Sequence, residues 1–343
     1  MEHREASLEE WKRLFETAIA FKQLECWEWI GNEDYFVVSD PETGELGYCV
    51  VLGNGGMEFG LNVYMGKESA GYLQKLLNDD IQDNDEFLRQ TKAIVVNFED
   101  RGDLEKTDLD LIRRLGYKFR GSKEWPLFRS YEPGLVPWTL HQGQVRFLTT
   151  ALEQTIMYAQ RLYLERMGKV PVAEEAYGKR LHRVPTIHED GVSWKDQWRP
   201  FVEDIVEEEP YQYSDELMLK QIQKQMPSGN DVWESDYDFA PIIIGEKGQR
   251  GYYPRLCLWV NGKDGMILDA AIIEAVDCRA EYVNQLLKLI RNKNRKPALI
   301  RVGSHKAYAA LEHAADKLGI KLKLDRRLDA LDEAREAIIG GIG

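Results

Sequence analysis

Residues 255–274, RLCLWVNGKDGMILDAAIIE, contain the pattern that decides the fold of the second half of the chain. Two apolar runs, residues 255–260 and 266–274, flank the polar stretch NGKDG at residues 261–265. Apolar runs of this length on either side of a glycine-containing turn predict a β-hairpin. The elements before and after this hairpin can then be placed by their own periodicity.

Strands and helices alternate on both sides of the hairpin. Residues 241–245 predict a preceding strand, and Tyr282, Leu286 and Ile290 recur at helical spacing after it. The remaining elements are a strand at 298–302, a helix capped by Ser304, a strand at 320–324 and a helix capped by Asp329. The order βββαβαβα predicts a mixed sheet with helical crossovers.

This order is similar to the ribonuclease H-like fold of transposases and integrases, over about residues 236–343. Residues 258–268 look like the hairpin between the second and third strands of that fold, and residues 296–302 look like its fourth strand. The resemblance implies carboxylates on the first and fourth strands and on a late helix, which hold a pair of divalent cations.

The carboxylate set that this resemblance implies is incomplete in the sequence. The predicted fourth strand ends in Gly303-Ser304-His305, without an acid. If the chain is a divergent nuclease, the candidate catalytic residues are Asp236, Asp238 and Glu333, and the cofactor is Mg²⁺ or Mn²⁺.

The first half of the chain predicts an α+β domain over residues 1–167. Strands are expected at 35–38, 47–52, 58–64 and 93–98, and helices at 7–22, 67–77, 107–116 and 140–166. Residues 125–138, WPLFRSYEPGLVPW, contain three prolines, and we expect an extended loop packed onto the domain.

The middle of the chain predicts a connector. Residues 168–235 show no sustained periodicity and contain five prolines, yet they have too many aromatic residues for a free linker. We therefore expect an α+β domain at 1–167, a connector at 168–235 and an α/β domain of ribonuclease H-like order at 236–343.

Charge is distributed unevenly along the chain. The net charge of −13 argues against a surface that binds phosphates throughout, but residues 279–327 hold thirteen Lys and Arg against four Asp and Glu. Such a cationic face would suit nucleic acid or a protein partner, or it would contact the acidic residues 203–209 of the same chain. The candidate binding residues are Lys288, Arg291, Lys293, Arg295, Lys296 and Lys306.

Metal-binding and redox patterns are missing. His182, His188, Glu189 and Asp190 show no recurrent ligand spacing, so no metal site is predicted. The four cysteines lack C-x-x-C spacing, which predicts reduced, buried thiols in a cytoplasmic protein. No apolar stretch is long enough to span a membrane.

Over its full length the chain also resembles an uncharacterised bacterial two-domain family, through residues 128–134, FRSYEPG, Pro137-Trp138 and Tyr253-Pro254. That resemblance implies no activity. Because no catalytic set is complete, we expect a noncatalytic binding or interaction protein without a cofactor, and an unknown protein partner is favoured. Three alternatives stay open: a divergent metal-dependent nuclease of ribonuclease H-like type, a nucleic-acid-binding adaptor, and a small-ligand enzyme with its site in the interdomain cleft.

Overall fold

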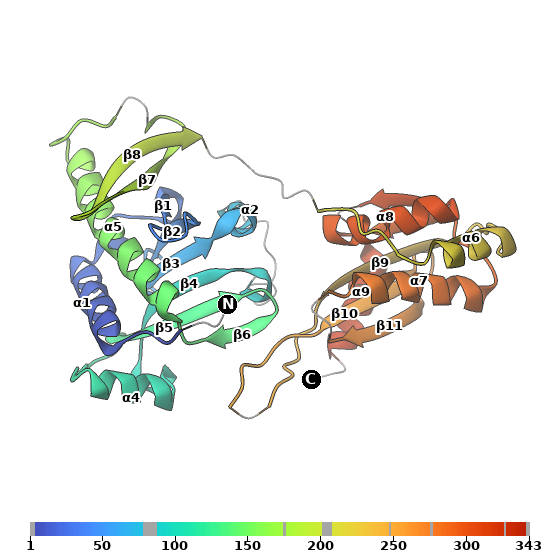
Figure 1. Cartoon of the computed structure of the whole chain (residues 1–343), viewed down its shortest axis with the longest axis horizontal. Helices are drawn as coiled ribbons and strands as arrows, with labels where there is room; N and C mark the ends of the chain where they lie inside the picture. Colours follow the sequence, from blue (N-terminus) through green and yellow to red (C-terminus); the bar gives the residue numbers. More distant parts are fainter. Residues whose placement is uncertain are drawn as a thin grey trace. The chain divides into compact units, whose positions relative to one another are not determined.

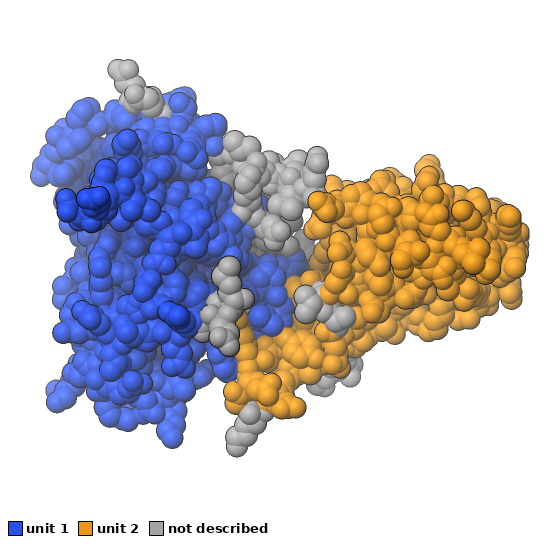
Figure 2. Space-filling view, viewed as in Figure 1, with its two compact units in different colours: residues 1–205 blue, residues 206–343 orange. Residues whose placement is uncertain are grey.

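The computed structural model describes residues 4–77, 88–173, 176–200, 208–246, 248–274, 277–325 and 327–340. The chain divides into two compact units, residues 1–205 and residues 206–343, called unit 1 and unit 2 (Figure 2). Each unit has its own mixed sheet and its own hydrophobic core. The predicted mixture of helices and mixed sheets is confirmed.

Unit 1 is built on an eight-stranded sheet in the order β6-β5-β4-β3-β2-β1-β7-β8. Helices α1 and α5 pack on one face over the larger core, and α2 packs on the other face (Figure 1). The elements are α1 Leu8–Leu24, β1 Phe36–Ser39, β2 Leu46–Leu52, β3 Gly60–Met65, α2 Gly66–Leu77, β4 Ala93–Glu99, α4 Lys106–Arg114, β5 Trp125–Glu132, β6 Leu135–Trp138, α5 Gln142–Arg166, β7 Lys179–His188 and β8 Gly191–Pro200.

The predicted loop at residues 125–138 is instead the hairpin β5–β6. Its prolines are compatible with strands because of where they lie. Pro126 is the second residue of β5, Pro133 lies in the turn before Gly134, and Pro137 lies on β6 at the edge of the sheet. Aromatic side chains of β5 reach the core, which explains the composition of this segment.

Much of the predicted connector, residues 168–235, is part of the two units. Strand β7 pairs in parallel with β1, and β8 pairs with β7 at the edge of the unit 1 sheet. Leu181, Trp194 and Trp198 pack on the core of unit 1. Helix α6, Glu216–Gln225, packs into unit 2 through Leu219 and Ile222. The aromatic residues of this region are therefore core residues of folded elements.

His182 on β7 lies on the sheet face opposite to Leu181 and is 9% exposed. Burial, with a smaller contribution from Arg199, lowers the pKa of its imidazole from 6.5 to about 4. Between these values the unfolded chain binds more protons than the folded chain, so stability is lost as the pH falls from 6.5 toward 4.

We expect His182→Gln to remove this part of the acid sensitivity, which is worth up to about 3 kcal/mol. Urea denaturation at neutral pH and near pH 4, for both proteins, measures it. The groups common to both proteins cancel in the comparison. An equal loss of stability in the two proteins would show that His182 is not responsible.

Unit 2 is built on a five-stranded sheet in the order β11-β10-β9-β12-β13. Strand β9 is antiparallel to β10 and parallel to β12, which is parallel to β13. Helices α6, α7 and α8 cover one face, and α9 covers part of the other (Figure 1). The elements are β9 Val232–Phe239, β10 Arg255–Asn261, β11 Ile267–Ile273, α7 Arg279–Lys293, β12 Leu299–Val302, α8 His305–Leu318, β13 Lys321–Leu324 and α9 Asp329–Gly340.

The predicted order βββαβαβα is present, but its first strand was predicted at the wrong position. Residues 241–245 form only an isolated bridge, between Ile244 and Tyr252, and β9 takes the place of the predicted strand. Trp233, Ser235 and Tyr237 are buried, and the two aromatic residues pack in the core under α7 and α8. The acids at alternate positions made this strand look like part of a polar loop.

The four cysteines are free and buried, as predicted. In the described part of the chain no helix has both the length and the apolar character needed to cross a lipid bilayer.

Candidate functional site

Strand β9 carries a row of three acids, Glu234, Asp236 and Asp238, on the face toward α9. We call them the acidic row. Glu234 is 2% exposed and Asp236 is 7% exposed. A buried carboxylate is costly unless it is paired or hydrogen-bonded, so the partners of these acids decide what the row can do.

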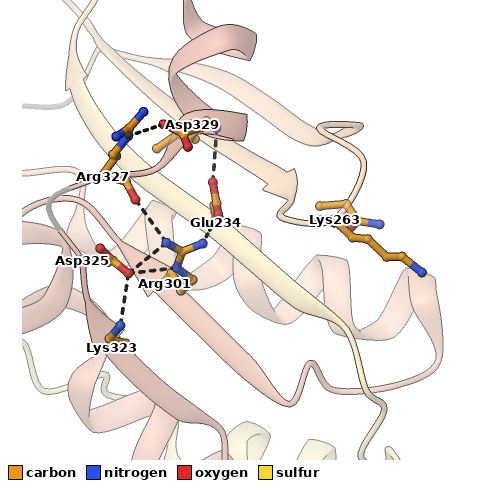
Figure 3. A network of polar contacts seen from close by, with 9 residues as sticks. Glu234, Lys263, Arg301, Lys323, Asp325, Arg327 and Asp329 are labelled. Atoms are coloured by element: carbon orange, nitrogen blue, oxygen red, sulfur yellow. Dashed lines mark hydrogen bonds and ion pairs between the residues drawn. The ribbon is translucent and has the colours of Figure 1, made fainter.

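Glu234 is held by Arg301, which lies beside it on β12 (Figure 3). Arg301 Nη1 donates to Glu234 Oε1 over 2.6 Å, and the backbone N–H of Leu331 donates to Oε2 over 3.3 Å. Burial raises the pKa of Glu234, and the Arg301 charge opposes that rise. Arg301 Nη2 also donates to Asp325 Oδ2 over 2.8 Å and to the carbonyl of Arg327 over 3.1 Å. The guanidinium is therefore fixed from several sides.

A hollow of about 700 Å³ lies beside this ion pair. Asp325 is the acceptor for both Arg301 and Lys323, whose contacts lower its pKa. Lys263 stands apart from this network in the close-up (Figure 3). Arg301 and Lys323 are already paired with carboxylates, so the hollow is a poor phosphate site. It is lined by Asn230, Asp231, Val232, Asn261, Gly262, Lys263, Leu299, Arg301, Lys323 and Asp325.

Asp236 is held by the start of α8. Ser304 Oγ donates to Asp236 Oδ1 over 2.7 Å and accepts from the backbone N–H of Ala307 over 3.2 Å, so one hydroxyl caps the helix and binds the acid. Burial raises the pKa of Asp236, and Lys306 is the largest opposing influence. A Cβ at Gly303 would lie 2.8 Å from Asp236 Oδ2, so a larger residue at this position would force the buried Asp236 carboxylate to shift.

Asp238 is paired with Lys306 in the first turn of α8, where Lys306 Nζ lies 3.2 Å from Asp238 Oδ1. The same ammonium lies 5.6 Å from the ring centroid of Tyr237. A side-chain cation therefore stands just past the end of β12, next to two of the acids.

These residues do not fit the divalent cations of a ribonuclease H-like nuclease. Such a centre needs carboxylates that converge on the ion. The end of β12 supplies Ser304 and Lys306 instead of an acid. Glu333 on α9 is exposed and makes no ion pair or hydrogen bond with the described residues. Throughout the described ranges, no three His, Cys, Asp or Glu side chains form a group that could hold a metal.

The six predicted basic residues do not form one free cationic face. Lys288 pairs with Asp269 over 3.3 Å, Arg295 pairs with Asp231 over 2.7 Å, and Lys306 pairs with Asp238. The acidic residues Glu203, Asp204 and Glu207, which we considered as a counterpart, lie outside the described residues.

Lys296 was wrongly expected at the surface. It is 7% exposed, and its Nζ donates to the carbonyl of Leu318 at the end of α8 over 2.9 Å. It satisfies a helix terminus and is not available to a ligand. Arg291 and Lys293 stay exposed near the end of α7.

Sequence reasoning missed Arg301 and Ser304 as the partners of the acidic row. Arg301 carried a usable signal, since a charged residue inside the apolar run Ala298-Leu299-Ile300-Arg301-Val302 needs a buried counter-ion. Ser304 was recognised only as a helix cap, because its second bond is to an acid far away in the sequence.

Fold and site together define a mixed α/β protein whose second unit has an acidic row engaged by its own chain, through two ion pairs and one serine hydroxyl. The chain belongs to the DUF7309 family, described as a domain of unknown function, whose model matches residues 11–183. A second model, domain of unknown function DUF6930, matches residues 218–339. Both models are described as domains of unknown function, in agreement with the uncharacterised status that the predicted resemblance implied. No curated protein matches the chain.

Solved structures of integrases and transposases show weak similarity. The chain is 22% identical to a chain of the simian T-cell lymphotropic virus intasome in complex with the PP2A regulatory subunit B56 gamma, over 34% of this chain and 40% of that one, with a TM-score of 0.25. It is 19% identical to the HTLV-2 integrase catalytic core domain in complex with magnesium, over 34% of this chain and 70% of that one, with a TM-score of 0.24. It is 12% identical to a chain of the pre-cleavage Mos1 transpososome, over 70% of this chain and 74% of that one, with a TM-score of 0.21.

Proposed function

We propose that unit 2 is a noncatalytic binding module with a ribonuclease H-like fold. The sheet order β11-β10-β9-β12-β13 supports this fold, because three consecutive antiparallel strands place the first strand in the middle, beside two parallel strands that arrive by helical crossovers. Asp236 then lies on the central strand, where nucleases of this fold carry an acid.

The engagement of all three acids of the row by the same chain is the observation that carries the noncatalytic assignment. Glu234 is bound by Arg301, Asp236 by Ser304, and Asp238 by Lys306. A divalent cation would have to displace the Lys306 ammonium and then find too few remaining carboxylates. Binding through other surfaces is compatible with this arrangement, whereas metal-dependent hydrolysis is not.

The edge strand β11 supports a protein partner over nucleic acid. It is the outermost strand of its sheet, and it exposes Ile267 at 43% and Ile272 at 41%. It contains neither the lysine nor the proline that commonly block pairing at an edge. An extended apolar segment of another protein could add to this edge by main-chain hydrogen bonds.

Fluorescence polarisation with labelled single- and double-stranded DNA and RNA tests this assignment of partner class. The double variant Arg291→Gln/Lys293→Gln removes the exposed cations of α7. We expect weak polarisation changes that are the same for the wild-type protein and the variant, because the other four predicted basic residues of unit 2, Lys288, Arg295, Lys296 and Lys306, are paired or buried. Tight, salt-sensitive binding that the double variant loses would favour a nucleic-acid adaptor instead.

A further inference from the structure

Strands β7 and β8 carry a cationic cluster on the face of the unit 1 sheet opposite to α5. Arg180 on β7 lies directly across from Arg199 on β8, and His182 lies across from Gln197. Leu181 and Trp198 point to the core on the other face, so the pleat places Arg180, His182 and Arg199 on one side. We call these three residues the cationic cluster.

Within the described residues, the arginines of this cluster have no acidic partner. Across the described ranges, neither Arg180 nor Arg199 forms an ion pair with a carboxylate. Arg180 stacks 4.8 Å from the ring centroid of Tyr35, and Gln197 Oε1 accepts from Arg199 Nε over 3.2 Å. Like charges directly opposite each other destabilise a strand pair, so an anion between them would stabilise this sheet edge.

Two buried polar atoms in the cluster also have no hydrogen-bond partner in the described part of the chain. They are His182 Nδ1 and Arg180 Nε. The His182 side chain is more than nine-tenths buried, and an unsatisfied buried donor or acceptor costs about 1–3 kcal/mol. Such atoms call for a ligand that can accept hydrogen bonds from both a guanidinium and an imidazole.

We propose that Arg180, His182 and Arg199 form an oxyanion site on unit 1, which binds a phosphate or carboxylate group. Two guanidinium groups supply the charge and the fork of donors that such oxygens prefer, and the buried, unpartnered His182 Nδ1 would donate to the same oxygens in its protonated form. The site is independent of the proposed function of unit 2.

NMR titration of the histidine rings in the full-length protein tests this site. The titration is run in chloride, acetate and inorganic phosphate at equal ionic strength, and the His182 resonance is identified by its absence in His182→Gln. The other titratable or charged groups on this face of β7, β8 and the segment leading into β1 are Tyr35, Arg180, His188, Lys195 and Arg199. A bound anion favours the imidazolium, so we expect its titration midpoint to rise by about 1 pH unit or more.

Variants assign the effect to the cluster. Arg199→Gln removes an exposed residue at a strand end, and Arg180→Gln removes its opposite neighbour. Each should remove most of the anion-dependent rise, whereas the exposed Lys118→Gln should keep it. A rise in phosphate alone or in acetate alone identifies the ligand class. The same midpoint in all three salts, or an undiminished rise in both arginine variants, would overturn the proposal.

Discussion

Replacing Arg301 with methionine should lower the free energy of unfolding by about 3–5 kcal/mol, because it leaves the Glu234 carboxylate buried without its counter-ion. Glu234 is 2% exposed, and its 2.6 Å contact with Arg301 is its only ion pair with the described residues. Urea denaturation gives the size of the effect. Hydrogen exchange of the β9 and β12 amides shows that the loss is in unit 2.

Two controls separate the buried charge from a general loss of packing. Glu234→Gln/Arg301→Met removes both charges and should recover much of the lost stability. Arg327→Met breaks the 2.8 Å pair with Asp329, in which both side chains are mostly exposed, and should change little. If Arg301→Met is as mild as Arg327→Met, Glu234 is not held as a buried anion.

The second prediction is that Ser304→Asp/Lys306→Ala gives unit 2 an affinity for Mn²⁺ that the wild-type protein lacks. Ser304 Oγ lies 2.7 Å from Asp236 Oδ1, so a carboxylate at position 304 would stand beside Asp236. Removing Lys306 frees Asp238 as well. Aspartate is a good N-cap, and α8 should stay intact.

Thermal unfolding in Mn²⁺ measures this gain. Ligand at about 100 times its Kd stabilises a protein by about 2.7 kcal/mol, so the variant should melt at a higher temperature with Mn²⁺ than with EDTA. The wild-type protein should melt at the same temperature in both. The single variant Ser304→Asp, which keeps Lys306, should respond less. Equal stabilisation of the wild-type protein by Mn²⁺ would contradict the account.

Local patterns predicted most of the elements around the hairpin at residues 255–274. The hairpin itself, α7, β12, α8, β13 and α9 follow from apolar periodicity and from caps such as Ser304. The first hairpin of unit 1, β1–β2, was also visible from its Asp-Pro turn. In these elements the signal for the helix, strand or turn lies within the segment itself.

Elements that depend on distant partners were not predictable in the same way. Strand β9 alternates aromatic residues with acids, and only Arg301, Ser304 and Lys306 make the acid face compatible with burial. The sequence of strands β7 and β8 resembles a connector because it contains prolines and charged residues. The two strands tolerate these residues at the edge of the sheet, where β7 pairs with β1, a strand more than a hundred residues earlier in the chain.

The candidate site was predicted only in part. Asp236 and Asp238 were chosen from the resemblance and do lie on the central strand, but Glu333 is exposed and apart from any ion pair or hydrogen bond with the described residues. The basic residues were recognised from the excess of Lys and Arg in residues 279–327. Their pairing with Asp231, Asp238 and Asp269 depends on the folded sheet. Charge counts cannot separate a free cation from a neutralised one.

A cleavage assay tests the central claim most directly. Full-length protein is incubated with labelled single- and double-stranded DNA and RNA in Mg²⁺ or Mn²⁺, with Asp236→Asn purified in the same way as the control. Because Ser304 and Lys306 already engage the acids that would hold the metal, we predict intact nucleic acid in every sample. Metal-dependent cleavage by the wild-type protein that is lost in Asp236→Asn would contradict the noncatalytic assignment.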